Sequence, residues 1–241
     1  MNRTLPLLTF LSALAFALAP FLAENFAGFR PDQFPVPQDN PPVQPAGWAF
    51  AIWGLIYIWL ILGTAYGAFR RAGHPDWARL WPWLLASLLP GVFWLELAQA
   101  SFLWATALIW WMAVTAIAAL FNAADRNRWM QRWPVSIYAG WLTAAASVSV
   151  GLALGGYGVL GPQTSAVVAL LLILAIALPV QWSRPDAPGY GAAVTWALAG
   201  VAAANAGDGS LGLAVAAGVA ALTVAGVALF KSAQTAHRPL P

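Results

Sequence analysis

Residues Ala46–Phe69 read AGWAFAIWGLIYIWLILGTAYGAF, an unbroken run without a charged side chain. About 20 apolar residues suffice for an α-helix to cross the hydrocarbon core of a bilayer. In that core the backbone N–H and C=O groups must be bonded within the segment, which a helix achieves on its own. The run therefore predicts a transmembrane helix.

Runs of the same kind occupy most of the chain, between clusters of charged residues and prolines. The shortest, Tyr190–Asn205, is either a full span or a re-entrant segment. The first run resembles a secretory signal, but Pro20 would directly follow the cleavage site, so we interpret it as a retained helix. The predicted fold is all-α, a polytopic transmembrane bundle of about eight helices. The predicted spans are Leu5–Ala23, Ala46–Phe69, Leu80–Ala100, Phe102–Ala124, Val135–Leu154, Thr164–Trp182, Tyr190–Asn205 and Leu211–Phe230.

The composition supports a single transmembrane domain over residues 1–241 and excludes several other classes of protein. Hydrophobic residues make up 61% and charged residues 8% of the chain, whereas soluble domains have about 25% charged residues. The absence of cysteine excludes disulfides and thiolate chemistry. Because His74 and His237 lie near or beyond helix ends, no metal or haem site is expected. The net charge of +3 arises in short loops, so nucleic-acid binding is not expected either.

The basic residues predict the orientation of the bundle in the lipid bilayer. With the N-terminus inside, the cytoplasmic segments hold all 11 lysines and arginines except Arg30. The positive-inside rule predicts this distribution. A topology with one central helix more or fewer would place the basic residues on both sides. Both termini are therefore expected to be cytoplasmic. The basic residues on that side are Arg3, Arg70, Arg71, Arg79, Arg126, Arg128, Arg132, Arg184, Lys231 and Arg238.

One long segment, Glu24–Pro45, separates the first two spans. Its proline density favours an extended, semi-rigid conformation. Long loops within compact bundles are often lids or binding elements, so this loop is either a lid or a simple connection. The prolines are Pro31, Pro35, Pro37, Pro41, Pro42 and Pro45.

Tryptophan is unusually frequent, with 15 in the chain. In the second span, Phe50, Trp53 and Tyr57 recur at spacings of three and four and so share one helix face. Such a face suits either packing against a neighbouring helix or a pocket for an aromatic ligand. Tryptophans that lie inside their spans are Trp53, Trp59, Trp94, Trp110, Trp111 and Trp141. Those beside the cytoplasmic arginines fit an interfacial belt: Trp77, Trp81, Trp83, Trp129, Trp133 and Trp182.

Glu96 is the only ionisable residue well inside a predicted span. Charged groups in hydrocarbon are costly and usually face the bundle interior at functional sites, and Gln99 follows one turn later on the same face. The alternative places Glu96 close to the outer interface, where its carboxylate reaches water. No second membrane carboxylate, buried histidine or serine–base pair accompanies it, so enzyme activity is not predicted.

Glycines recur at the spacing of helix-contact motifs in Gly63–Gly67 and Gly151–Gly155. Small residues four positions apart let two helices approach closely. In a chain with 21 glycines, packing within the bundle is favoured over a homodimer, although both uses stay open. The last three spans are rich in alanine and glycine, which is typical of tight scaffold packing.

The second and fifth spans carry motifs that resemble those of a known family. The second begins Pro45-Ala-Gly-Trp48-Ala-Phe50-Ala-Ile-Trp53-Gly-Leu-Ile-Tyr57, and the fifth contains Tyr138-Ala-Gly-Trp141-Leu142. Together with the proline-rich loop, they resemble the TspO/MBR family of tryptophan-rich sensory or translocator proteins. The resemblance covers residues 1–155. The remaining residues, 156–241, look like the additional C-terminal helices of longer bacterial members.

Two departures from the family pattern concern the pocket. The spacing between Trp48 and Trp53 is one residue shorter than in five-helix members, and Ser149 stands where their last helix usually carries asparagine. The resemblance implies a five-helix core, in a bacterial inner (plasma) membrane, whose pocket is closed by the first loop. That pocket would bind porphyrins, sterols or related hydrophobic molecules, with a porphyrin as a ligand and no other cofactor.

The expected function is therefore sensing or regulation through a hydrophobic small molecule. Two alternatives are a secondary transporter that uses Glu96 as a proton site, although inverted repeats are not visible, and a structural subunit docked through its C-terminal helices. The ligand-binding residues that the resemblance implies are Trp48, Phe50, Trp53, Tyr57 and Trp141. We add Glu96 and Gln99 because polar side chains that are buried in a membrane at such a cost usually have a function.

Overall fold

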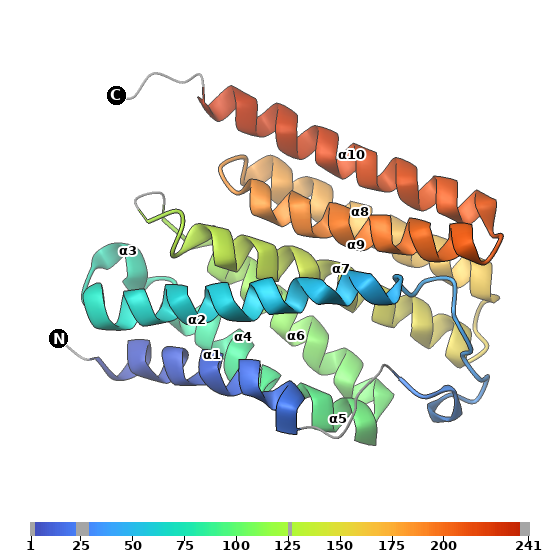
Figure 1. Ribbon diagram of the computed structural model, residues 1–241, viewed down its shortest axis with the longest axis horizontal. Helices are drawn as coiled ribbons and strands as arrows, with labels where there is room; N and C mark the ends of the chain where they lie inside the picture. Colours follow the sequence, from blue (N-terminus) through green and yellow to red (C-terminus); the bar gives the residue numbers. More distant parts are fainter. Residues whose placement is uncertain (1–2, 23–28, 125–126, 237–241) are drawn as a thin grey trace.

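The computed structural model describes residues 3–22, 29–124 and 127–236. Over these ranges the chain forms α-helices and two short 3₁₀ helices without any strand, so the all-α prediction is confirmed. The long helices lie side by side with similar axes (Figure 1). The elements are α1 (Thr4–Leu22), η1 (Pro31–Gln33), η2 (Gly47–Ala51), α2 (Ile52–Arg70), α3 (Pro75–Ala78), α4 (Trp81–Gly91), α5 (Trp94–Ala100), α6 (Phe102–Phe121), α7 (Arg132–Gly156), α8 (Pro162–Ser183), α9 (Pro188–Gly207) and α10 (Leu211–Ala236).

Most of the predicted spans correspond to single long helices. Among the described residues, α1, η2 with α2, α6, α7, α8 and α10 are long and apolar enough to cross a membrane, and α4 with α5 would form a bent seventh span. α9 is not in this group, because small residues dominate its sequence. Its 20 residues nevertheless extend about 30 Å, the thickness of the hydrocarbon core. Tyr190–Asn205 is thus part of a continuous helix and not a re-entrant loop.

The third predicted span, Leu80–Ala100, is broken between α4 and α5, whose axes differ by 42°. Pro90 lies inside the last turn of α4, and proline has no N–H to donate to the carbonyl four residues earlier. That carbonyl, of Ala86, accepts a hydrogen bond from the indole Nε1–H of Trp111 at 2.9 Å instead. The proline weakens the helix at this point, and Trp111 satisfies the carbonyl group left free.

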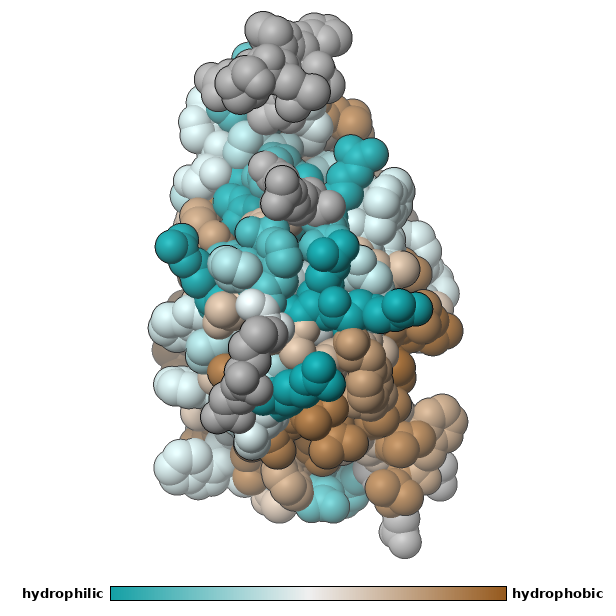
Figure 2. Space-filling model, turned by 90° about the vertical axis from the view of Figure 1, so that its left-hand side faces the viewer, coloured by the Kyte–Doolittle hydropathy of each residue, from teal (hydrophilic) through white to brown (hydrophobic). Residues whose placement is uncertain are grey.

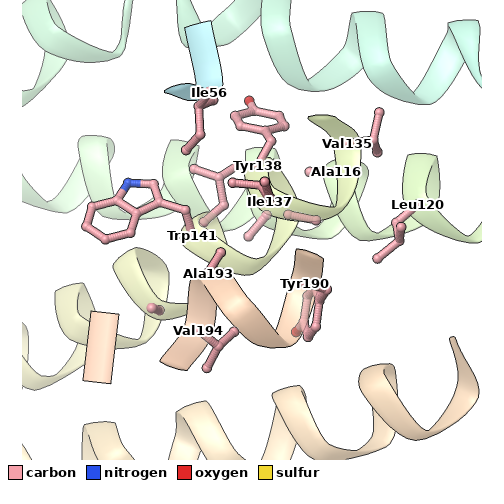
Figure 3. Close-up of a cluster of buried hydrophobic side chains, with 14 of the residues drawn as sticks. Ile56, Ala116, Leu120, Val135, Ile137, Tyr138, Trp141, Tyr190, Ala193 and Val194 are labelled. Carbon is pink, nitrogen blue, oxygen red and sulfur yellow. The ribbon is translucent and has the colours of Figure 1, made fainter. Parts of the chain in front are cut away.

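α7 is the central helix of the bundle. It packs against α2, α6, α8 and α9, and most of its residues are buried. Figure 3 shows Tyr138 of α7 facing Ile56 of α2, with Tyr190 of α9 on the other side of α7. The Tyr138 hydroxyl lies 2.9 Å from Ser87 Oγ of α4, and the Tyr190 hydroxyl lies 3.0 Å from Thr143 Oγ1 of α7. α7 therefore connects the first five spans to the C-terminal helices.

Both glycine motifs are used inside the chain. Gly67 of α2 faces Trp77 and Trp81, and Gly151 of α7 faces Ala169 of α8, each too closely for a Cβ atom. The motifs therefore serve packing within the bundle, the use that the sequence favoured. Trp77 and Trp81 are each 1% exposed, so their assignment to the interfacial belt is wrong. Their rings fill the space that the missing side chain of Gly67 leaves.

The two ends of the bundle differ in charge. The start of α1, the end of α10 and the α6–α7 and α8–α9 connections lie at one end, on the left of Figure 1. Figure 2 looks onto this end and shows hydrophilic side chains gathered across its middle. Arg30 is at the opposite end, and Arg126 and Arg238 lie outside the described residues. The basic residues are thus separated as the predicted topology requires. Those placed at this end are Arg3, Arg70, Arg71, Arg79, Arg128, Arg132, Arg184 and Lys231.

The long α1–α2 loop lies across the other end of the bundle. Its residues 23–28 are outside the described ranges. Farther along, the Val36 N–H donates to the Gly156 carbonyl of α7 at 2.9 Å, and the Gln33 side chain donates to the Ala98 carbonyl of α5 at 2.9 Å. The described part of the loop is therefore anchored over α5 and α7.

Candidate ligand-binding cavity

A cavity of about 490 Å³ lies between the helices of the first five predicted spans. Small-molecule pockets typically measure about 300–1,000 Å³. Its walls come from α1, the α1–α2 loop, α2, α4, α5, α6 and α7. The lining residues are Phe16, Ala19, Pro20, Gln44, Gly47, Phe50, Trp53, Tyr57, Gly91, Trp94, Leu95, Ile109, Met112, Trp141, Leu142 and Ala145.

The aromatic face of α2 forms one wall of the cavity. The rings of Trp53 and Tyr57 are stacked, with 5.1 Å between their centroids. Phe16 of α1 meets both rings edge-on, at 5.7 Å from Trp53 and 5.4 Å from Tyr57. Residues four apart lie one above the other on a helix, and edge-to-face contacts suit the charge distribution of aromatic rings. Local spacing on α2 and the approach of α1 together build this wall.

Trp141 of α7 forms the facing wall. Its ring is edge-on to Trp53 at 6.1 Å and to Phe50 at 5.7 Å. It is 2% exposed, and its Nε1–H is buried without a hydrogen-bond partner among the described residues. Aromatic residues of the second and fifth predicted spans therefore converge on one cavity.

Several lining residues carried no signal in the sequence. Phe16, Gln44, Ile109 and Met112 come from three different segments and follow no motif. Phe16 is only 5% exposed, yet in the sequence it is one of many apolar residues of α1. Trp94 is different, because its position inside a predicted span already set it apart from the interfacial tryptophans. The packing of α1 and α6 against α2 and α7 brings Phe16, Ile109 and Met112 to the cavity, and the path of the α1–α2 loop brings Gln44 there.

Trp48 was expected to line the pocket but does not. It lies on η2, is 48% exposed, and meets Trp196 of α9 edge-on at 4.8 Å. A 3₁₀ helix has about three residues per turn instead of 3.6, so η2 changes the phase of the helix face between Trp48 and Trp53. The indole of Trp48 consequently points to α9, while Phe50 stays at the cavity.

Glu96 and Gln99 also do not line the cavity, and the structure agrees instead with the alternative that places Glu96 close to the outer end of the bundle. Both side chains are exposed, on the short helix α5, whose Trp94 and Leu95 face the cavity instead. The prediction assumed one straight helix through Leu80–Ala100, in which Glu96 would be deep in the bundle. The bend places α5 at the end of the bundle, beside the α1–α2 loop, so the burial argument does not apply.

The lining of the cavity carries no formal charge. Its polar groups are the Gln44 amide, the Tyr57 hydroxyl and the tryptophan indoles. Within the described ranges, no group of three histidine, aspartate or glutamate side chains is placed to hold a metal ion. The site is suited to a flat, largely apolar molecule with a few polar atoms.

A second cavity of about 100 Å³ adjoins the first. The two share Gln44, Phe50 and Trp141, among other residues. The smaller one also includes Ala197 of α9. One of the C-terminal helices therefore contributes to the wall of the site.

A charged cluster lies outside the cavity, at the basic end. Asp186, in the α8–α9 connection, accepts hydrogen bonds from Arg132 at 2.8 Å and from Arg184 at 2.7 Å. Arg184 also donates to the carbonyls of Leu120 and Ala123 at the end of α6. Burial raises the pKa of Asp186, but its hydrogen bond to Arg184 and the charges of both arginines outweigh this effect and hold the pKa below its usual value. The cluster ties α6, α7 and α8 together.

Comparison with known proteins places this architecture in a family. A family model described as TSPO-like protein matches residues 7–230. Searches among curated proteins and among solved structures found no match. The matched range begins in α1, includes every helix that lines the two cavities, and continues through α8 and α9 into α10. The chain belongs to the family of TSPO-like proteins.

Proposed function

We propose that this chain is a membrane sensory or regulatory protein that binds a hydrophobic or aromatic molecule, similar to a porphyrin or a sterol, in the 490 Å³ cavity. The observation that carries the proposal is the convergence of Phe16, Trp53, Tyr57 and Trp141 on one uncharged space. Flat aromatic walls recognise flat apolar ligands through area and edge contacts, and the indole and hydroxyl groups add direction. The role is binding without chemical conversion of the ligand.

The position of Glu96 removes the main argument for a transporter. That argument required Glu96 to act as a proton site on the path of the solute, yet Glu96 is exposed and does not line the cavity. For the subunit alternative, α9 is not available as a docking face, because it packs against α7 and α10 within the chain. The exposed apolar side chains of α10, such as Leu222 and Leu229, are equally suited to contact lipid. Binding in the cavity is the function that the site supports best.

The first test is the binding of protoporphyrin IX, with cholesterol as competitor, to the purified protein in detergent. Trp53→Ala should raise the dissociation constant about tenfold or more, because burying an aromatic side chain is worth roughly 1.5–3 kcal/mol. The measurement is quenching of tryptophan fluorescence during titration.

Trp104→Ala is the matched control. Trp104 is 70% exposed and does not line the cavity, so each variant loses one tryptophan but only one variant loses a cavity wall. Equal affinity of the two variants, or no saturable binding by the wild type, would contradict the proposal.

A further inference from the structure

The last part of the α1–α2 loop, residues 42–49, borders the candidate site. Gln44 and Gly47 line the large cavity, and Pro45 lines the small one. The segment includes the first residues of η2, and Phe50, which follows it in the same 3₁₀ helix, lines both cavities. A ligand in either cavity would lie against this segment. Its stiffness is therefore a property of the binding site.

α9 of the C-terminal region holds this segment through three hydrogen bonds. The indole Nε1–H of Trp196 donates to the Ala49 carbonyl at 2.8 Å, and the Asn205 side chain donates to the Pro42 carbonyl at 2.7 Å. Between them, the Ala46 N–H donates to the Gly200 carbonyl at 3.0 Å. The bonds span the segment from its first residue to its last.

The approach of α9 to the loop is close as well as polar. A Cβ atom on Gly200 would lie 2.8 Å from Ala49 Cβ and 3.0 Å from Pro45 Cβ, closer than packed carbon atoms normally come. Ala49 is fully buried. Trp196 adds the edge-on contact with Trp48. The loop thus rests directly on the backbone of α9, at a position where only glycine fits without movement.

We propose that α9 is a positioning element of the ligand site: it immobilises residues 42–49 and thereby sets how fast a ligand leaves the cavity. This inference rests on the proposed function. Ligand release past the loop requires the bonds from Trp196, Gly200 and Asn205 to open. The residues of α9 act on the ligand through the loop, apart from Ala197, which lines the small cavity.

Two glycines of α9 provide a matched pair of variants. Gly200→Ala places a methyl group against Pro45 and Ala49, whereas Gly207→Ala, on the same helix, meets no atom within 4 Å. Both changes replace glycine by alanine in one helix, and both keep all 15 tryptophans. Release of protoporphyrin IX, followed by fluorescence recovery after dilution, should be about tenfold faster in Gly200→Ala and unchanged in Gly207→Ala.

A readout without ligand separates this inference from the proposed function. Hydrogen–deuterium exchange of peptides that cover residues 43–50 should be faster in Gly200→Ala than in Gly207→Ala or the wild type. Trp196→Phe keeps a ring beside Trp48 but removes the bond to Ala49, and should shift the exchange in the same direction. If the wild type binds no probe, the proposed function fails, while the exchange experiment still decides whether α9 immobilises the loop.

Three results would overturn the inference. One is equal exchange of residues 43–50 in the two glycine variants. The second is faster exchange in Gly200→Ala with an unchanged rate of porphyrin release, which would mean that the ligand leaves by a path that does not involve the loop. The third is equal acceleration of release by Gly200→Ala and Gly207→Ala, which would point to a general change in α9.

Discussion

Single aromatic residues decide the shape of the cavity because their rings meet at right angles. Trp141 is edge-on to both Phe50 and Trp53, so its ring closes one side of the space without filling it. The buried Nε1–H of Trp141 has no hydrogen-bond partner in the described part of the chain. A buried donor without an acceptor costs about 1–3 kcal/mol. The ring of Trp141, and not its polar atom, therefore explains its place in the structure.

This argument predicts different effects for two substitutions of Trp141. Trp141→Ala should lower the free energy of unfolding by about 3 kcal/mol, as for other large-to-small changes in a core, and should weaken protoporphyrin IX binding. Trp141→Phe keeps an aromatic wall and loses no hydrogen bond within the described part of the chain, so the free energy of unfolding should stay close to that of the wild type. Binding should weaken less in Trp141→Phe than in Trp141→Ala, because only the indole N–H is lost. Thermal unfolding and fluorescence titration in the same detergent measure the two effects. A Phe variant as impaired as the Ala variant would show that the N–H is needed.

At the scale of elements, ionic and polar groups join helices where the apolar core does not. The carboxylate of Asp186 bridges Arg132 at the start of α7 and Arg184 at the end of α8. Arg184 in turn donates to the carbonyl of Leu120 in the last turn of α6 and to that of Ala123 just beyond this helix. One carboxylate therefore orients the guanidinium groups that hold three helix ends together.

Asp186→Asn should destabilise the protein and alter its pH dependence. Breaking a buried pair costs about 3–5 kcal/mol; since the Asp186 side chain is 26% exposed, we expect roughly 2 kcal/mol. Because the folded pKa of Asp186 lies below its usual value, the stabilisation is present above the ordinary pKa of about 3.9 and is lost as the pH falls through the folded pKa. The unfolding temperatures of wild type and variant should differ at pH 7 and converge below about pH 4. A difference that is independent of pH would rule out a role for the charge.

The loop and α9 show how distant elements depend on each other. The proline-rich loop was expected to be either a lid or a connection, and its described part is bonded to α9 at three points. The sequence of α9, rich in alanine and glycine, indicated tight packing. It did not indicate that the packing partner of Gly200 would be this loop. Such a pairing depends on contacts between residues about 150 positions apart.

For the whole molecule, the separation of basic residues is the feature most relevant to insertion. Apart from Arg30, which lies at the other end, the described arginines and Lys231 lie at one end of the bundle. Positive residues are retained on the cytoplasmic side during membrane insertion. The positive-inside rule therefore predicts that the end where α1 begins and α10 ends is cytoplasmic and that the end covered by the α1–α2 loop faces outward.

Because the chain contains no cysteine, single introduced cysteines report this orientation directly. Asp39→Cys lies in the loop at one end and Ala78→Cys in α3 at the other, and both positions are exposed. A membrane-impermeant maleimide should label Asp39→Cys in intact cells and Ala78→Cys only after permeabilisation. The reverse pattern would invert the topology, and labelling of both in intact cells would contradict it.

The sequence by itself determined the membrane-spanning class, the approximate bounds of the helices and the side on which the basic residues gather. These properties depend on local hydropathy and on charge counts, which need no knowledge of long-range contacts. The sequence also placed Phe50, Trp53 and Tyr57 on one face of the second predicted span, because helical periodicity is a local property.

Only the tertiary structure decided which residues meet at the cavity. Phe16 and Met112 reach it through the packing of α1 and α6, while the bend after Pro90 carries Glu96 away from it. Likewise, a 3₁₀ turn directs Trp48 to α9. Packing between helices depends on crossing geometry and on where small residues permit close approach, and neither is encoded in the periodicity of one segment.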